Sequence, residues 1–407
     1  MGTLPALLPV LGRRHLDSHR DRLPASGALP LPGGPSTGSA TRLDAATRLD
    51  AVLVPAYRSL RHLQAAADVA AETGAALVLL CSGGVEAGAV ARWLGSCGPG
   101  GSPAAATALA IDVRAAGPAP AGYPGLATSR FGPGRRWGPD THLKRNLGIL
   151  LARLLGWRRL LFHNDDVSGL GGPDLARTCA LLDDPDAPRR AAGWAFRDFP
   201  DNSVVCHAYR HAGGAQDTFI SDAALAVDAT GPLPFFPGVY NEDWLFLQPM
   251  LHRGEVALAG DWLPQEAYRP FADPRRAGSE EFGDVLGEGL LRLEHLAAPL
   301  SAALEPDYWR EELACRKRLI RRIDELLPDD PERELIRLCL KEAVCRHRDD
   351  WPQQLAGYVR DWQEDLDRWQ QAQEALPSGL EPPAALERLG LAGESRGPAW
   401  VAGTAGR

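Results

Sequence analysis

The sequence lacks the features that mark secreted, membrane-spanning and disulfide-rich chains. Its seven cysteines are scattered without CxxC or zinc-ribbon spacing, which indicates reduced thiols in a reducing compartment. No run approaches the roughly 20 apolar residues needed to cross a bilayer. The N-terminus has no compact order of basic residues, apolar residues and cleavage site. We therefore expect a cytoplasmic protein without a transmembrane segment.

The sequence also lacks an excess of positive charge. Its formal net charge is −8, so general electrostatic attraction to nucleic acid or to an anionic membrane is not expected. The shares of hydrophobic residues, 45%, and of charged residues, 24%, are ordinary for a globular protein. At 407 residues the chain has room for two domains with sizeable apolar cores.

Composition divides the chain into four parts. Residues 1–48 are rich in Pro, Gly, Ser and Ala, which predicts a disordered leader. Residues 49–275 alternate apolar runs with helical patterns and are the expected catalytic domain. Residues 276–378 repeat apolar residues at helical spacing among many charges, which predicts a helical C-terminal domain. Residues 379–407 return to Gly, Ala and Pro and predict a flexible tail.

Short apolar runs in the second part predict the strands of a parallel sheet. The runs at 51–54 and 76–81 are continuous, as in strands buried on both faces, and a third run ends at Ile111-Asp112-Val113. Helical patterns at 60–72 and 85–94 separate these runs. Strands that alternate with helices are typical of an α/β sheet with right-handed crossovers.

A fourth strand leads directly into two acidic residues. An amphipathic helix from Leu143 to Leu154 precedes apolar residues 160–162, and His163-Asn164-Asp165-Asp166 follow. Adjacent carboxylates at a strand end suit a hard divalent cation that also binds a diphosphate. Asp165 and Asp166 are therefore candidate ligands of Mg²⁺ or Mn²⁺. A turn or helix cap is the alternative, since Asn and Asp are typical there.

Glu242 and Asp243 form a second acidic pair, between a Gly- and Pro-rich turn and an apolar helical pattern. The dipole of a helix keeps a carboxylate at its N-terminus ionised, and such a group can accept a proton from an attacking hydroxyl. The pair is therefore a candidate for the catalytic base, with a helix cap as the alternative. Lys144 and Arg145 are candidates for binding a diphosphate, with solvated helix charges as the alternative.

In their order and separation these motifs resemble those of GT-A glycosyltransferases, especially of the family 2 type. The motifs are Val54-Pro55-Ala56-Tyr57, Lys144-Arg145-Asn146-Leu147-Gly148-Ile149, Asn164-Asp165-Asp166 and Asn241-Glu242-Asp243-Trp244. The resemblance implies a Rossmann-like mixed sheet with helices on both faces, followed by the α-helical C-terminal domain. It also implies a metal-assisted hexosyltransferase that moves a sugar from a nucleoside-diphosphate sugar to an acceptor hydroxyl.

The resemblance implies roles for single residues. Asp166 would bind Mn²⁺ or Mg²⁺, with Asp165 beside it in contact with metal, sugar or ribose. Asp243 would be the base of an inverting transfer, with Glu242 next to it. The nucleotide-sugar would contact residues from several motifs: Pro55, Tyr57, Arg58, Lys144, Arg145, Asp165 and Gly214.

The sequence departs from the family's pattern in two places. The second strand ends in Cys81-Ser82-Gly83-Gly84, where these enzymes commonly have aspartates that hold the base, and Asp112 is the expected substitute. A late metal-binding His is replaced by Gln265-Glu266. His207 and His211 are candidates for completing the metal site, and ordinary strand histidines are the alternative.

Other functions stay open at this point. The two departures favour a catalytically inactive glycosyltransferase-like binding or scaffold protein. Ser82-Gly83-Gly84 could instead hold phosphate in a PP-loop-like ATP-using enzyme, since glycine amides near a helix N-terminus bind phosphate. A sugar-phosphate nucleotidyltransferase should have glycine in the loop 55–59, which has none. The acceptor stays unknown, and the helical part could form the acceptor site, cover the catalytic domain or mediate a homodimer.

Overall fold

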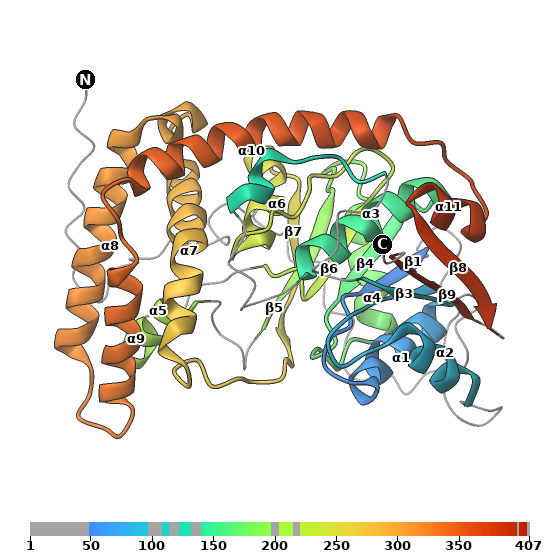
Figure 1. Cartoon of the computed structure of the whole chain (residues 1–407), viewed down its shortest axis with the longest axis horizontal. Helices are drawn as coiled ribbons and strands as arrows, with labels where there is room; N and C mark the ends of the chain where they lie inside the picture. The colour runs from blue at the N-terminus through green and yellow to red at the C-terminus, as the bar shows by residue number, and fades with distance from the viewer. Residues whose placement is uncertain are drawn as a thin grey trace.

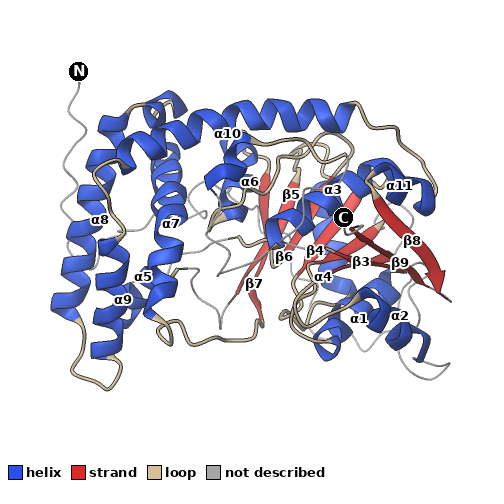
Figure 2. Ribbon diagram, in the orientation of Figure 1, coloured by secondary structure: helices blue, strands red, loops and turns tan. Residues whose placement is uncertain are grey.

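The centre of the molecule is a nine-stranded sheet in the order β7-β5-β6-β4-β1-β2-β3-β9-β8 (Figures 1 and 2). The structure is a computed structural model that describes residues 49–96, 108–113, 122–131, 140–196, 203–214, 220–396 and 399–404. The expected leader at 1–48 lies outside the described residues.

Four parallel strands form the middle of the sheet, and they are the four that the apolar runs predict. They are β1 (Ala51–Val54), β2 (Ala76–Cys81), β3 (Ala108–Asp112) and β4 (Arg159–His163). All residues of β1 and β2 are buried, as expected for continuous apolar runs covered on both faces. Because β1 lies between β2 and β4, the loops that follow these three strands meet at one edge of the sheet.

The other half of the sheet is mixed in direction. Strand β6 (Ala224–Asp228) runs antiparallel to β4 and to β5 (Ala191–Phe196), while β7 (Val256–Leu263) runs parallel to β5. The reversal of β6 brings its first residues beside the last residues of β4, with His163 opposite Ala224. Residues just before β6 therefore lie at the same edge as residues just after β4.

Helices cover both faces of the sheet. Helices α1 (Gln64–Thr73), α2 (Ala87–Ser96) and α4 (Gly172–Leu182) pack on one face, and α3 (Thr141–Leu155) and α6 (Glu242–His252) pack on the other. Helix α3 lies close on β1, because a Cβ atom at Gly148 would stand only 2.9 Å from Leu53 Cδ1. Gly74 and Gly156 end α1 and α3 with φ of 69° and 77°.

The helical part of the structure begins with α7, and the domain boundary expected at 275/276 stays a prediction. It consists of α7 (Pro274–His295), η5 (Leu300–Leu304), α8 (Pro306–Leu326), α9 (Arg333–Cys345) and α10 (Trp351–Glu374). Helices α7, α8 and α9 stand together at one end, next to α5 (Val204–His211), and α10 runs from them across the molecule towards the sheet (Figure 1). The fold class is therefore confirmed: a mixed sheet with helices on both faces and a helical C-terminal part.

The helical part shares its core with the sheet. Trp309, Trp362 and Trp369 are fully buried in the same apolar cluster as Leu53 of β1 and Phe162 of β4. Among the described residues before α3 there are also two short 3-10 helices, η3 (Leu60–Leu63) and η4 (Ala127–Phe131). The packing of these tryptophans is within the chain, so it lends no support to the homodimer considered from the sequence.

The prediction of a flexible tail at 379–407 needs correction, because most of this part of the chain is regular structure. Residues in this part form α11 (Pro382–Arg388) and the strands β8 (Leu391–Arg396) and β9 (Ala399–Thr404). Strand β9 pairs in parallel with β3, and β8 pairs with β9. The reason is that the edge of β3 offers unpaired backbone groups, which a strand of almost any composition can satisfy.

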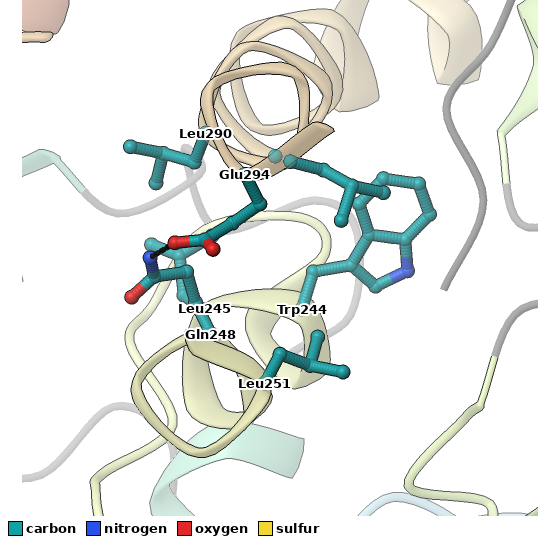
Figure 3. A pocket seen from close by; sticks show the side chains of 8 residues that line it. Trp244, Leu245, Gln248, Leu251, Leu290 and Glu294 are labelled. Carbon is teal, nitrogen blue, oxygen red and sulfur yellow. Dashed lines mark hydrogen bonds between the residues drawn. The ribbon is translucent and has the colours of Figure 1, made fainter. Parts of the chain in front are cut away.

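The space between α6 and α7 is nearly filled. A cavity of about 10 Å³, room for one water molecule, is lined by Trp244, Leu251 and Glu294 among others (Figure 3). Gln248 Nε2 donates to Glu294 Oε1 at 3.0 Å across it. None of the helices that the structure describes is long and apolar enough to cross a membrane.

Candidate active site

Two loops join at the carboxyl ends of the neighbouring strands β1 and β4. Asp165 Oδ2 accepts hydrogen bonds from the backbone N–H groups of Tyr57 and Arg58, each at 2.9 Å. Charge-assisted bonds of this kind are roughly twice as strong as neutral ones. Asp165, which the sequence predicts near metal or sugar, thus fixes the loop after β1 against the loop after β4.

The guanidinium of Arg58 lies among three carboxylates. Its Nη2 atom is 2.8 Å from Asp166 Oδ2, its Nη1 atom donates to Glu266, and its Nε atom is 3.7 Å from Asp165 Oδ1. Asp166 and Asp165 side chains are 10% and 8% exposed, whereas that of Arg58 is 36% exposed. The two aspartates are therefore largely enclosed by the fold, whereas Arg58 and Glu266, whose side chain is 50% exposed, reach the surface.

Glu266 reaches this group because the segment after β7 runs beside the segment after β4. Val167 and Gln265 form an antiparallel bridge, and Glu266 N donates to the carbonyl oxygen of Asp166 at 2.9 Å. Gln265 Nε2 also lies 3.3 Å from both carboxylate oxygens of Asp166. Burial raises the pKa of Asp166, and the positive charge of Arg58 opposes that rise.

A second group of carboxylates surrounds Arg145 at the same edge. Arg145 is 2% exposed; its Nη1 atom pairs with Asp222 and lies 2.9 Å from Glu242 Oε1. Its Nη2 atom donates to Asn164 Oδ1 at 2.9 Å, next to the paired aspartates. Arg145 therefore links the loop after β4 to the first turn of α6.

Asp243 stands in the first turn of α6 beside Glu242 and accepts a hydrogen bond from Trp244 N at 2.9 Å. Burial, together with the charge of Glu242, raises the pKa of Asp243 to about 7. Burial raises the pKa of Asp222 well above its usual value, and the charges of Asp243 and Asp166 add to that rise. The carboxylates around Arg58 and those around Arg145 thus lie close enough for their charges to interact.

Lys144 is buried below the loops rather than exposed between them. Its ammonium donates to Ala56 O at 2.9 Å and Ser82 Oγ at 2.7 Å, and it lies 3.0 Å from Asp140 Oδ1. Burial lowers the pKa of Lys144, and the charge of Asp140 opposes this. These three contacts use the three donors of the ammonium. The predicted contact of Lys144 with a diphosphate stays a prediction.

The loop Ser82-Gly83-Gly84 packs on the loop after β1. Ser82 N donates to Ala56 O, and Gly84 N donates to Tyr57 O at 2.8 Å. A Cβ atom at Gly83, whose φ is +60°, would overlap the ring of Tyr57. These amides hold protein carbonyls, which is unlike a phosphate-cradling loop and weakens the ATP-using alternative. Tyr57 itself is 46% exposed above this loop.

The remaining predicted residues lie at the edges of this region or apart from it. Pro55 follows β1 and is buried. Asp112, at the end of β3, accepts a hydrogen bond from Ala87 N at 2.7 Å and so holds the start of α2. Gly214 follows α5 and donates to Tyr209 O at 2.9 Å, but residues 215–219 beyond it lie outside the described part of the chain.

The two histidines considered as metal ligands stand on helix α5, so they are not the strand histidines that the alternative supposed. His211 Nε2 lies 2.7 Å from Asp330 Oδ2 of the helical part. The ring of His207 packs edge-on against Tyr268.

The sequence did not predict the ion pairs that Arg58, Glu266 and Asp222 form at this site. Glu266 carried a signal, since it follows a strand that ends at the site edge, but the bridge that turns it towards Asp166 depends on tertiary structure. Asp222 precedes β6, and only the antiparallel direction of β6 brings it to Arg145.

No protein-family model matches the chain, and no curated protein matches it significantly. Matching solved structures include three of glucosyl-3-phosphoglycerate synthase from Mycobacterium tuberculosis. One, with Mn²⁺, uridine diphosphate and glucosyl-3-phosphoglycerate, has 14% identity and a TM-score of 0.39 over 65% of this chain and 87% of that chain. One with phosphoglyceric acid has 14% identity and a TM-score of 0.38 over the same shares. One with Mn²⁺, uridine diphosphate and phosphoglyceric acid has 15% identity and a TM-score of 0.39 over 67% and 88%.

Proposed function

We propose that the chain is a metal-assisted glycosyltransferase that moves a hexosyl group from a nucleoside-diphosphate sugar to an acceptor hydroxyl. One observation carries the proposal: the carboxylates of Asp166 and Glu266 converge on a single positive charge, that of Arg58. Beside them, at the same sheet edge, stands Asp243, a carboxyl group with a pKa near neutrality. A cation site next to a proton acceptor is what sugar transfer from a diphosphate requires.

The residues present fit a divalent cation. Asp165, Asp166 and Glu266 offer only oxygen atoms, and they outnumber the one guanidinium between them by two negative charges. Mn²⁺ and Mg²⁺ prefer such ligands, and both leave positions for phosphate oxygens. Asp166 and Glu266 would hold the ion, which would supply positive charge to balance the departing diphosphate. Arg58, whose side chain is 36% exposed, contributes a bidentate donor to the diphosphate.

The protein's own groups then orient the reaction. Asp243 accepts the proton of the acceptor hydroxyl, whose oxygen attacks the anomeric carbon as the bond from that carbon to the diphosphate oxygen breaks. A base with a pKa of about 7 is half ionised at neutral pH, which favours proton transfer there. Arg145 balances the negative charge of Glu242 and Asp222 beside the base. Attack opposite the leaving group would invert the anomeric centre.

The exposed ring of Tyr57 supports a nucleoside site at the ends of β1, β2 and β3. Its ring lies over Gly83, where no side chain intervenes, and Lys144 Nζ lies 5.6 Å from the ring centroid. An aromatic ring in such a position can stack on a nucleobase. Pro55 shapes the loop that carries Tyr57, and Asp112 borders the same edge of the sheet.

The experiment that tests the function is a binding and turnover screen of UDP-, GDP- and dTDP-sugars with and without Mn²⁺. We expect calorimetry to show metal-dependent binding of one nucleotide family and slow release of its nucleoside diphosphate. Asp166→Asn should abolish both, whereas Asp174→Asn, in the first turn of α4 and paired with Arg177, should change neither. Failure of every nucleoside diphosphate to bind in the presence of metal would contradict the proposal and favour the scaffold protein.

A further inference from the structure

The turn that carries Glu242 and Asp243 rests directly on helix α7. Two glycines of α7 make the close approach possible. A Cβ atom at Gly283 would overlap the carbonyl oxygen of Tyr240, and one at Gly287 would lie 3.1 Å from Trp244 Cε3. The backbone before the candidate base is therefore in contact with the backbone of α7, without side chains between them.

Asn241, the residue before this pair, connects the turn to α7. Its backbone is left-handed, with φ of 61°, and its carbonyl oxygen accepts from Trp244 N and Leu245 N. Asn often begins a helix by capping it, but this side chain makes no cap hydrogen bond and donates instead from Nδ2 to Asp284 Oδ1 at 3.1 Å. A non-glycine residue in this conformation is held there by its surroundings, and such strain collects at functional sites.

Asp284 is in turn held by a buried ion network of the helical part. Its other oxygen, Oδ2, pairs with Arg316 of α8. Arg316 also binds Glu281 through two hydrogen bonds of 3.0 and 2.9 Å, and His347 Nε2 lies 2.8 Å from Glu281 Oε1. Asp284 and Glu281 are each 1% exposed, and Arg316 is 6% exposed. Breaking such a buried pair on one side leaves an uncompensated buried charge, so the network resists rearrangement.

We propose that Asp284 is a positioning residue for the reaction: through Asn241 it sets the orientation of the turn that carries Asp243. The inference rests on the proposed role of Asp243 as base. It assigns a function to the helical part, since Arg316 fixes Asp284 and is itself held by Glu281, which His347 also contacts. The helical part is then an active component of catalysis and not only a cover.

A metal ion is a weaker explanation of the same cluster. Ligand atoms of Cys206, Asp284 and Glu288 lie within 4.8 Å of one another, and all three residues are buried. However, Asn241 and Arg316 already occupy the two carboxylate oxygens of Asp284. A cation there would also stand beside the guanidinium of Arg316. The hydrogen-bond network accounts for these side chains without an ion.

The test uses two variants that preserve shape and one matched control. Asn241→Gly keeps the left-handed backbone and removes the carboxamide, and Asp284→Asn keeps the volume of the side chain. Each should lower kcat by about 10- to 100-fold, the cost of a small misplacement of a catalytic group, while the KM for the donor stays within twofold. The double variant should be no slower than the worse single variant, because both remove the same interaction.

Glu312→Gln is the control, because Glu312 lies 3.2 Å from Arg292 and joins the same two helices, α7 and α8, away from the turn. It should lower stability without changing kcat. Values of kcat within twofold of wild type for both Asn241→Gly and Asp284→Asn would overturn the inference. If the wild type turns over no donor, the proposed function fails, and hydrogen exchange then decides the positioning. Exchange of residues 240–245 should rise in both variants and stay unchanged in the control; unchanged exchange in all three would overturn the inference on its own.

Discussion

At the scale of the residue, the candidate site consists of carboxylates that the fold holds close together despite their mutual repulsion. Asp166 is buried beside Asp165, and Asp222 is buried beside Glu242 and Asp243, with one arginine serving each group. Like charges at such distances destabilise the folded state unless a cation joins them or a proton binds. The first group has the features of a cation site, and the second has those of a proton acceptor.

The raised pKa of Asp243 predicts the pH dependence of transfer. Because the base must be ionised, kcat should rise with pH through a midpoint near 7 and level off above it. Asp243→Asn should reduce kcat by about 10²- to 10⁴-fold and abolish that midpoint, while calorimetry should find the donor bound as tightly as by the wild type. A variant that keeps the wild-type pH profile would remove Asp243 as the base.

The stabilisation that Asp243 contributes should fall as the pH rises, whereas kcat should increase. A carboxyl whose pKa is higher in the folded state than in the unfolded chain stabilises the fold below the unfolded pKa of about 4, and this contribution is lost as the pH rises through about 7. Asp243→Asn should therefore raise the thermal midpoint of unfolding more at pH 8 than at pH 5. Equal shifts at the two pH values, measured by calorimetry, would contradict the raised pKa.

Under the proposed function Glu266 should be a metal ligand. Glu266→Gln should weaken Mn²⁺ binding by about 10- to 100-fold, whereas Glu387→Gln on the surface of α11 should leave it unchanged. Arg58→Gln should strengthen the binding of Mn²⁺ alone, because the competing guanidinium is gone. Calorimetric titration with Mn²⁺ in the absence of nucleotide measures all three; tighter binding by Glu266→Gln would contradict the assignment.

At the scale of the element, α10 fastens the helical part to the loop before α3. Asp365 on α10 is fully buried and accepts hydrogen bonds from Ala127 N at 2.9 Å and from Thr128 N and Thr128 Oγ1, both at 2.8 Å. Further along α10, Gln373 exchanges two hydrogen bonds with the backbone of Leu233. These contacts place both segments on the same side of the sheet as α3.

Asp365→Ala should destabilise the protein by about 2–4 kcal/mol, since it leaves buried backbone donors of Ala127 and Thr128 without their acceptor. Asp361→Ala is the matched control, because Asp361 lies one turn earlier on α10 and pairs with Arg130, which is largely exposed. That substitution should cost about 1 kcal/mol or less. Chemical denaturation compares the two, and similar losses would show that the buried acceptor has no special role.

The elements that could be predicted best are those that a local sequence pattern determines. The continuous apolar runs gave the four parallel strands, and Gly74 and Gly156 marked the ends of α1 and α3 because both adopt a left-handed backbone. Strands β8 and β9 could not be predicted, since their pairing is decided by the edge of β3 and not by their own composition. Similarly, Asp165 and Asp166 stand out at a strand end, but nothing local indicates that Arg145 is buried or that Glu266 turns towards Asp166.

At the scale of the whole molecule, the sheet and the helical part share an apolar cluster. Residues 49–275 contribute β1 and β4, and residues after 275 contribute Trp309, Trp362 and Trp369 to the same cluster. Calorimetry should therefore show one cooperative unfolding transition for the full chain. A fragment of residues 49–275 should fail to unfold cooperatively, since it would expose the apolar surface that these tryptophans cover. Two separate transitions in the full chain would contradict the shared core.

The pairing of β3 with β9 has a consequence for the synthesis of the chain. Ala108 on β3 pairs with Ala399 on β9, so the partner strand leaves the ribosome long after β3 has been made. Contacts between residues so far apart in sequence form slowly and late. Until then one edge of the nascent sheet has no partner, and such edges promote aggregation. Strand β9 thus makes the solubility of the nascent chain depend on how soon residues 399–404 follow β3.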